Sequence, residues 1–412
     1  MCSNAIEYSH LCPHRRRVLP TASHSFRQRV ALYGVLFMMG ADMFLVPMLI
    51  PAIAATLASS IAQSAFTVTA FGLAYTGSGP LLAGVMHSWP SRRIIGVGLA
   101  VVVIACTTAI FAQSVAMLIA ARTASGIGAA IVNPAVWSRL HTTTADHARG
   151  RVILGGTAVS AAGQVVGIPL GTLVAAHCGW RLAFAALAVG FVAVSIGTRI
   201  TTSRDAGFAE PEEGPQGLTG SLSLWRTPAF SLAIAANIAT QAARLGVYSY
   251  VAALLLHRHA LHGAGLGAIG ILAGTGSLVG ALLATATVSR WCRRGWPVLG
   301  LSATGTAVVF TGIVLTAAPV SLALNLFGVA ISFAAGIAVF GTGQFYVASA
   351  FRGDRTAISW NSSAMYIGAA IGTFTLGFTA PGSTAFTVAS LAFTGVGGVC
   401  YLVAIGIGDR TS

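Results

Sequence analysis

The sequence predicts an all-α membrane protein of twelve transmembrane helices, arranged in two pseudo-symmetric halves of six. Of its 412 residues, 55% are hydrophobic and only 8% are charged, whereas about a quarter of the residues of an average soluble domain are charged. The apolar runs are long enough to cross a hydrocarbon core of about 30 Å as helices. They are continuously apolar and do not alternate, which excludes a barrel of membrane-spanning strands.

Twelve such runs recur along the chain, each about 20 residues long. They cover residues 30–53, 63–86, 94–113, 117–139, 152–175, 182–200, 229–255, 264–288, 297–317, 320–344, 357–380 and 385–407. A polar interval rich in Glu and Pro follows the sixth run. The predicted organisation is therefore a basic tail (1–29), a first half (30–200), a linker (201–228), a second half (229–407) and a short tail (408–412). The first tail has no apolar stretch and is not expected to be a cleaved signal peptide.

The two halves also suggest an internal repeat, because they begin 199 residues apart, at positions 30 and 229. This offset aligns Thr76-Gly77-Ser78 with Thr275-Gly276-Ser277 and places Gln241 opposite Asp42. Equal halves of this kind are typical of membrane proteins built by duplication.

The basic residues predict the orientation of the chain. All 23 are arginines, and 19 of them lie in the tails, in the central linker and in the loops that follow even-numbered spans. Only Arg181 and Arg258 fall on the opposite side, while Arg122 and Arg244 lie inside spans. Positive residues are retained on the cytoplasmic side, so we expect both termini in the cytoplasm of a bacterial inner-membrane protein. The arginines form separate clusters and no continuous face, which argues against a nucleic-acid partner.

One acidic residue, Asp42, lies inside a predicted span. A central charge costs about 2.5 to 3.5 kcal/mol on insertion scales, so it needs a structural or functional reason. Arg122 in the fourth span lies within about 6 Å of the same depth at 1.5 Å per residue, which a long side chain can cover. Asn133 lies eleven residues further on, on the same helical face. We therefore expect Asp42 and Arg122 to pair and to form a proton-coupling site.

The seventh span carries a polar stripe of Asn237, Gln241, Arg244 and Tyr248, at steps of four, three and four residues. Such spacing places all four on one helical face. Two interpretations remain open: the stripe lines a substrate cavity, or it forms a hydrogen-bonded seam between helices. If it lines a cavity, the other candidates for substrate binding are Asn133, Gln164 and Asn361.

Other functions lack the residues they need. The ten histidines show no metal-ligand spacing on a shared helix, and no nucleophile elbow, Walker loop or pair of catalytic carboxylates occurs. We therefore expect no enzymatic activity, no metal and no cofactor. The six cysteines give no extracellular pair, so no disulfide is expected.

Several motifs between about residues 30 and 407 resemble a known family. They are Gly40-Ala41-Asp42-Met43-Phe44 with Leu49-Ile50-Pro51-Ala52-Ile53-Ala54, Val68-Thr69-Ala70-Phe71-Gly72-Leu73-Ala74-Tyr75, Arg122-Thr123-Ala124-Ser125-Gly126-Ile127-Gly128, Gly163-x-x-x-Gly167-Ile168-Pro169-Leu170-Gly171, Gly179-Trp180-Arg181-x-x-Phe184 and Tyr250-Val251-Ala252-Ala253-Leu254-Leu255. Together they resemble the major facilitator superfamily, within it the twelve-span drug:proton antiporter group, and most closely the branch of arabinose-efflux-like sugar and drug efflux permeases.

The resemblance assigns roles to individual residues. It implies proton coupling at Arg122 and a conformational role for Gly163, Gly167, Pro169 and Gly171 in span five. The loop after span two departs from the family, because its usual acid and first arginine are missing and Arg92 and Arg93 remain. This departure removes the usual charged latch, and these two arginines, with Arg149 and Arg151, are expected to bind helix C-termini or lipid phosphates.

The resemblance and the residues together lead to a functional expectation. It is a proton-coupled antiporter that exports a small organic molecule by alternating access, acting as a monomer in the lipid bilayer. Its cavity, with one acid and two arginines, would suit a neutral or anionic polar molecule such as a sugar, a nucleoside or a phenolic antibiotic. Two alternatives remain: an uncoupled facilitator or importer of a small polar solute, and a membrane sensor or scaffold that transports nothing.

Overall fold

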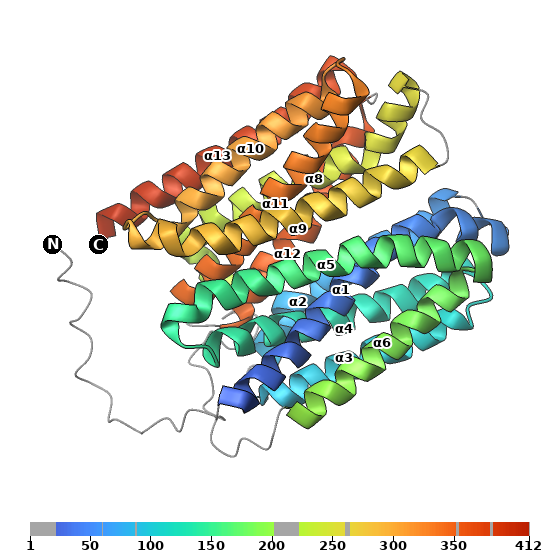
Figure 1. Ribbon diagram of the computed structural model, residues 1–412, viewed down its shortest axis with the longest axis horizontal. Coiled ribbons are helices and arrows are strands. Elements are labelled where there is room, and N and C mark those ends of the chain that lie inside the picture. Colours follow the sequence, from blue (N-terminus) through green and yellow to red (C-terminus); the bar gives the residue numbers. More distant parts are fainter. Residues whose placement is uncertain are drawn as a thin grey trace.

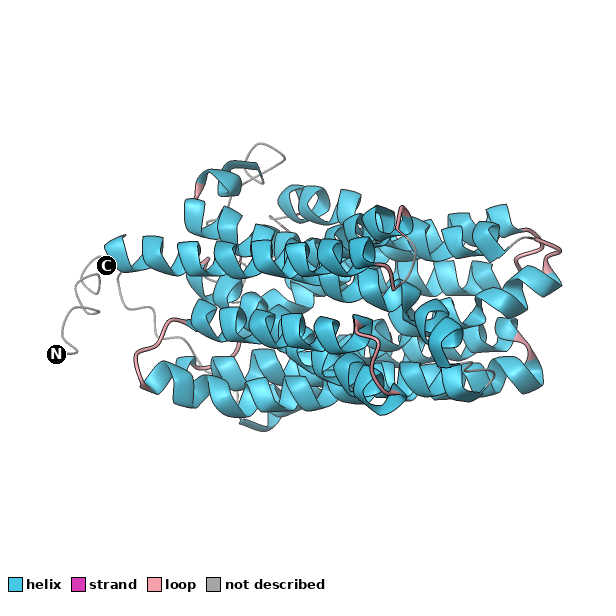
Figure 2. Ribbon diagram, turned by 90° about the horizontal axis from the view of Figure 1, so that it is seen from above, coloured by secondary structure: helices cyan, strands magenta, loops and turns pink. Residues whose placement is uncertain are grey.

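The computed structural model describes residues 22–411, except residues 60, 87–88, 202–221, 260–263, 352–353 and 380–381. Within these residues the chain is helical and contains no strand (Figure 2). The tail before Ala22 and most of the predicted linker lie outside the described residues.

Each of the twelve predicted spans corresponds to one long helix. The helices are α1 (Ala22–Thr56), α2 (Ile61–Val85), α3 (Ser91–Ile110), α4 (Val115–Thr142), α5 (Asp146–Cys178), α6 (Trp180–Thr201), α8 (Pro228–His259), α9 (Ala264–Arg293), α10 (Val298–Ala317), α11 (Leu322–Ala350), α12 (Arg355–Gly377) and α13 (Thr384–Thr411). A short 3₁₀ turn, η1 (Leu224–Arg226), precedes α8. Judged over the described residues alone, seven of these helices are long and apolar enough to cross a membrane: α3, α4, α6, α9, α10, α11 and α13.

The helix ends show local reasons for the breaks between spans. Ser114 accepts a hydrogen bond from the Met117 amide (3.2 Å) at the start of α4, and Asp354 accepts one from the Thr356 amide (2.8 Å) at the start of α12. Side-chain caps of this kind satisfy amides that the first turn leaves unpaired. Pro90 before α3 and Pro297 before α10 have almost the same backbone angles, φ −63°, ψ 140° and φ −64°, ψ 138°. The third helix of each half therefore begins in the same way.

The two halves are α1–α6 and α8–α13, and they lie side by side (Figure 1). In the first half α1 packs on α5, and α2 and α3 pack on α4; in the second, α8 packs on α12 and α13, and α9 and α10 pack on α11. Between the halves, α5 lies along α9 and α2 lies along α12. The start of α1 and the end of α13 lie at the same end of the bundle, which we call the terminal end.

Close glycine contacts repeat in both halves and give the register of the repeat. Gly167 of α5 approaches Ala41 of α1 so closely that a Cβ would lie 2.9 Å from the Ala41 Cα, and a Cβ on Gly372 of α12 would collide with the Ala242 carbonyl of α8. Ala242 follows Ala41 by 201 residues. Between α1 and α8 the offset is therefore 201 residues where 199 was predicted, so the position opposite Asp42 is Ala243, two residues after Gln241.

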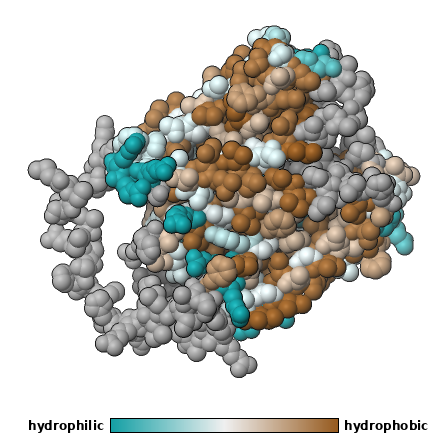
Figure 3. Space-filling model, viewed as in Figure 1, coloured by the Kyte–Doolittle hydropathy of each residue, from teal (hydrophilic) through white to brown (hydrophobic). Residues whose placement is uncertain are grey.

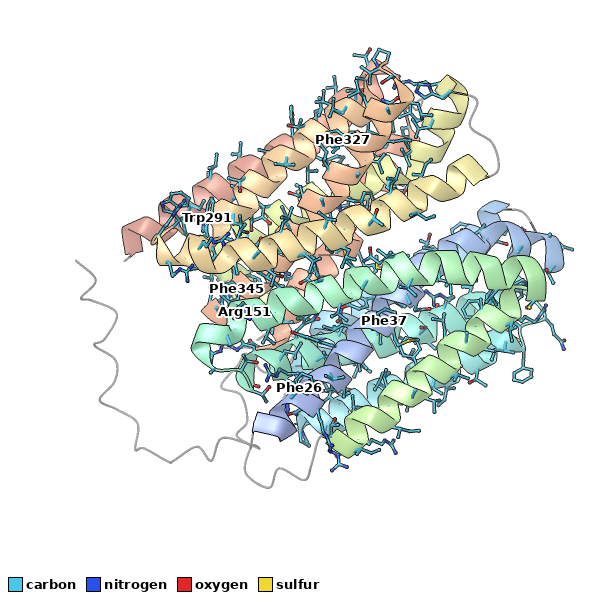
Figure 4. The ribbon with its side chains drawn as sticks, in the orientation of Figure 1. Phe26, Phe37, Arg151, Trp291, Phe327 and Phe345 are labelled. Atoms are coloured by element: carbon cyan, nitrogen blue, oxygen red, sulfur yellow. The ribbon has the colours of Figure 1, made fainter. Side chains whose placement is uncertain are left out.

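At the terminal end the two halves touch directly. A Cβ built on Gly150, in the first turns of α5, would lie 3.4 Å from the Val288 Cγ1 of α9 and 3.5 Å from the Phe345 Cζ of α11. Figure 4 shows Phe345 next to Arg151 at this junction. Closer to the middle of the bundle, a Cβ on Gly79 of α2 would lie 2.9 Å from the Ser359 hydroxyl of α12.

The surface matches a lipid environment. Large apolar side chains are exposed along the long sides of the bundle, among them Ile104, Val189, Phe374 and Leu402, each more than 60% exposed. Figure 3 shows this apolar surface, with hydrophilic residues gathered toward the ends of the helices. Such a continuous apolar face has no place in a soluble monomer, and it confirms the predicted class of an all-α membrane protein.

Candidate functional site

The structure brings together the two charged residues that were predicted inside spans of the first half, Asp42 and Arg122. Arg122 Nη1 on α4 donates to Asp42 Oδ1 on α1 at 2.8 Å. Both side chains are almost fully enclosed, at 2% and 1% exposed. Because both side chains are shielded from solvent, each charge depends on the other for its stability.

The surroundings of this pair leave part of the arginine unused. The guanidinium lies 4.4 Å above the centre of the Phe71 ring on α2, a favourable position for a cation. Its Nε atom and the Ser125 hydroxyl, one turn further along α4, are both enclosed without a hydrogen-bond partner. The pair is thus held by one strong contact and bordered by unsatisfied donors.

Asn133, predicted on the same face as Arg122, has a different partner. Its Nδ2 donates to the Tyr75 hydroxyl of α2 at 2.9 Å. The Tyr75 ring lies 4.4 Å from the ring of Tyr366, which belongs to α12 in the other half. The Tyr366 hydroxyl reaches the Met43 sulfur at 3.5 Å, directly after Asp42. Tyr366 therefore connects the second half to the helix that carries the acid.

In the second half, buried side-chain amides form one hydrogen-bonded chain that starts at Arg244. Arg244 Nε donates to Gln241 Oε1 (2.9 Å), and Gln241 Nε2 donates to Asn237 Oδ1 (3.1 Å). Asn237 Nδ2 donates to Asn361 Oδ1 of α12 (3.0 Å), and Asn361 Nδ2 donates to Gln344 Oε1 of α11. We call these five residues the amide chain. Each member donates in the same direction, away from the arginine.

The amide chain continues toward the first half. Gln344 Nε2 lies 3.4 Å from the Ser362 hydroxyl on α12, and Ser362 in turn neighbours the Tyr75 hydroxyl within hydrogen-bonding reach. Polar side chains thus run without a break from Arg244 in the second half to Tyr75 and Asn133 in the first.

The polar stripe on α8 forms a hydrogen-bonded seam in its first part, and its role as a cavity wall stays a prediction. Asn237 and Gln241 are completely buried and bonded to neighbouring helices, so they form a seam. Arg244 is 3% exposed but uses only Nε in the hydrogen bonds that the described residues give it. Tyr248 is partly exposed and packs edge to face on Phe333 of α11, with 4.7 Å between the ring centres.

The predicted residues of the fifth span belong to α5. Gly163 and Gly167 lie against α1 at Phe37 and Ala41, directly beside Asp42, and Figure 4 shows Phe37 on that helix. Gln164 is buried on α5. The side chain of Pro169 and the surroundings of Gly171 lie outside the described residues, although both positions belong to α5.

Arginines at both ends of the bundle bind helix C-termini. At the terminal end, Arg92 donates to the Arg199 carbonyl at the end of α6 (3.5 Å) and Arg149 to the His141 carbonyl at the end of α4 (3.2 Å), while Arg93 lies 4.2 Å over the Trp89 ring. At the opposite end, the two arginines that depart from the charge bias bind the ends of α3 and α10. Arg181 donates to the Ala112 carbonyl (2.7 Å) and Arg258 to those of Ala317 (2.7 Å) and Ala318 (2.8 Å).

Sequence reasoning missed four residues of the site. Tyr75, Tyr366, Gln344 and Phe333 complete the aromatic contact and the amide chain. Gln344 carried a usable signal, since it is an amide at the edge of a predicted span, whereas the two tyrosines and the phenylalanine look like ordinary apolar positions. Across the described residues, no group of three His, Cys, Asp or Glu side chains is placed to hold a metal ion.

Comparisons with known proteins place this architecture in a family. The family model of the Major Facilitator Superfamily matches residues 32–373. The uncharacterized MFS-type transporter YbcL of Bacillus subtilis (strain 168) is 24% identical over 258 residues, an alignment that spans 62% of this chain and 65% of that protein. The chloramphenicol resistance protein of Streptomyces lividans is 26% identical over 293 residues, which span 66% of this chain and 72% of that protein.

Solved structures agree with the fold. A crystal structure of the transporter FucP in the outward conformation superposes with a TM-score of 0.71 at 14% identity, over 94% of this chain and 99% of that one. A structure of the E. coli fucose:proton symporter FucP gives a TM-score of 0.72 at the same identity and coverage. Because the family model covers most of the chain and the twelve helices have the family's arrangement, the chain belongs to the major facilitator superfamily and is a multi-pass membrane transporter.

Proposed function

We propose that this transporter is a proton-coupled antiporter that exports a small organic molecule, with Asp42 and Arg122 as the proton-coupling pair. The observation that carries the proposal is the buried contact between them, 2.8 Å long and enclosed by three helices of the first half. A lone acid in the interior is costly and has little structural use beyond this partner. Similarity to the chloramphenicol resistance protein supports export as the direction.

The pair offers a simple switch. With Asp42 charged, the ion pair holds α1 to α4 at mid-span. A proton on Asp42 removes the negative charge, so Arg122 loses its partner and the two helices lose this contact. Gly163 and Gly167 bring α5 against α1 at the same level, so a movement of α1 is passed on to α5. In turn, α5 lies along α9 of the other half.

We also propose that the protein lies in the bacterial inner membrane with both termini in the cytoplasm and acts as a monomer. Protons then enter down their gradient while substrate leaves. Movement of one positive charge inward gains about 2.3 kcal/mol per 100 mV of membrane potential.

The test is transport by purified protein in liposomes with an imposed pH gradient, using labelled chloramphenicol, sugars and nucleosides. Wild type is expected to drive substrate uphill, and Asp42→Asn to retain only exchange or downhill flux. Asp354→Asn is the matched control, since this acid caps α12 outside the membrane interior and asparagine caps equally well. Equal flux by wild type and Asp42→Asn, independent of the gradient, would show a facilitator and refute coupling at Asp42.

A further inference from the structure

The second buried arginine is charged without a counter-ion in the described part of the chain. Arg244 lies in the middle of α8 and is 3% exposed. Asp42 is already paired with Arg122 at 2.8 Å, and Asp354 caps α12. A cation left alone at this depth is expensive, so such residues mark ligand or ion pathways.

The geometry of the guanidinium shows which atoms remain for a ligand. Its Nε hydrogen is taken by Gln241 Oε1 at 2.9 Å. No other hydrogen bond engages it among the described residues, which leaves Nη1 and Nη2 available. These two nitrogens carry parallel N–H groups in one plane, a fork that matches two oxygens attached to one planar centre.

The fork is held in place by its surroundings. Gly336 of α11 makes room for the side chain, because a Cβ there would collide with the Arg244 Cδ. Gln241 fixes Nε, and the amide chain behind it fixes Gln241. Every amide in that chain turns its oxygen toward the arginine side and donates away from it. At this edge the guanidinium therefore supplies the donors, and the matching ligand group must be an acceptor.

Aromatic side chains border the fork. The Arg244 Cζ lies 4.9 Å from the centre of the Phe333 ring, and Tyr248 packs edge to face on Phe333 with 4.7 Å between the ring centres. Two aromatic rings beside a planar cation provide an apolar wall that suits a flat substrate body. The phenol of Tyr248 adds a polar tip.

We infer that Arg244 is the polar anchor for substrate, binding an aromatic molecule through a planar group that carries two acceptor oxygens, either a carboxylate or its neutral isostere, a nitro group. The inference rests on the proposed transport function and adds the class of substrate. Arg122 and Asp42 then serve the proton, and the fork of Arg244 serves the substrate.

The test is equilibrium binding to protein in lipid nanodiscs, by calorimetry with no pH gradient. Four probes share one body: 4-nitrophenyl, 4-carboxyphenyl, 4-acetylphenyl and unsubstituted phenyl β-D-glucoside. We expect the two-oxygen probes to bind at least 10-fold more tightly than the others. Arg244→Gln removes this preference, and Arg244→Lys removes most of it because an ammonium has no fork. Arg258→Gln is the matched arginine control and should keep the preference for the two-oxygen probes.

Two outcomes would overturn the inference. They are binding of the acetyl probe as tight as that of both two-oxygen probes, and a preference for the two-oxygen probes that survives Arg244→Gln. If Arg244→Gln fails to fold, Arg244→Lys and Gly336→Ala, which displaces the side chain, provide the same comparison. Asp42→Asn must retain the preference, so a failure of proton coupling and a failure of this site are read from separate experiments.

Discussion

Gly98 of α3 and Gly128 of α4 lie so close together that a Cβ on either would be 2.9 Å from the carbonyl oxygen of the other. The second half repeats the contact: a Cβ on Gly312 of α10 would lie 2.9 Å from the Gly328 carbonyl of α11, and the reverse distance is 2.7 Å. Lipid gives helices little hydrophobic reason to associate, so close backbone approach supplies much of the attraction. The two halves use the same contact for that purpose.

The first prediction concerns this contact. Gly98→Ala should lower the free energy of unfolding by about 1 to 3 kcal/mol, because the added methyl overpacks the interface with α4. Gly96→Ala is the matched control on the same helix, since nothing lies within 4 Å of its Cβ position. It should be neutral or stabilising by up to about 1 kcal/mol through helix propensity. Unfolding of both variants in mixed micelles checks the prediction, and an equal loss for the two would contradict it.

The second prediction concerns the buried ion pair. Arg122→Gln leaves Asp42 without its partner in the interior and should cost about 3 to 5 kcal/mol of stability. The double variant Asp42→Asn/Arg122→Gln should recover most of the loss, because neither residue is then charged. A double-mutant cycle from unfolding measurements tests this. Additive losses would show that the two side chains do not depend on each other.

The third prediction concerns the amide chain. Asn361→Leu keeps a similar size but leaves Gln344 Oε1 without its partner, and it leaves Asn237 Nδ2 only the backbone carbonyl of residue 361, at 3.3 Å. Unpaired buried polar groups cost about 1 to 3 kcal/mol each, and values at the lower end are typical inside membranes. Thr107→Val is the control, since its exposed hydroxyl bonds only to the Val103 carbonyl of its own helix, and it should change stability by less than about 0.5 kcal/mol. A thermal shift no larger than that of the control would show that the chain contributes nothing.

The fourth prediction concerns orientation. Cys178 and Cys292 are both exposed and lie at opposite ends of the bundle, Cys292 at the terminal end. In single-cysteine variants, a membrane-impermeant maleimide added to intact cells should label Cys178 and should label Cys292 only after permeabilisation. Buried Cys106 is the negative control, and the reverse pattern would place the termini outside.

The sequence by itself determined the twelve spans, because a hydrocarbon core imposes a fixed length of apolar helix that is visible in composition. It also determined that Asp42 and Arg122 would meet, since a single acid inside the membrane has few possible partners. Depth counted along two helices was sufficient to pair them.

Only the tertiary structure decided which polar side chains bond to one another, because contacts between helices distant in the chain leave no periodic pattern in the sequence. It separated Asn237 and Gln241, which form a seam, from Arg244, whose fork stays unused. It also showed that Asn133 bonds to Tyr75, that Tyr366 of the other half stacks near this site, and that 201 residues relate α1 to α8 where 199 were predicted. Glycine contacts set the distance between helices, and that distance determines which polar side chains meet.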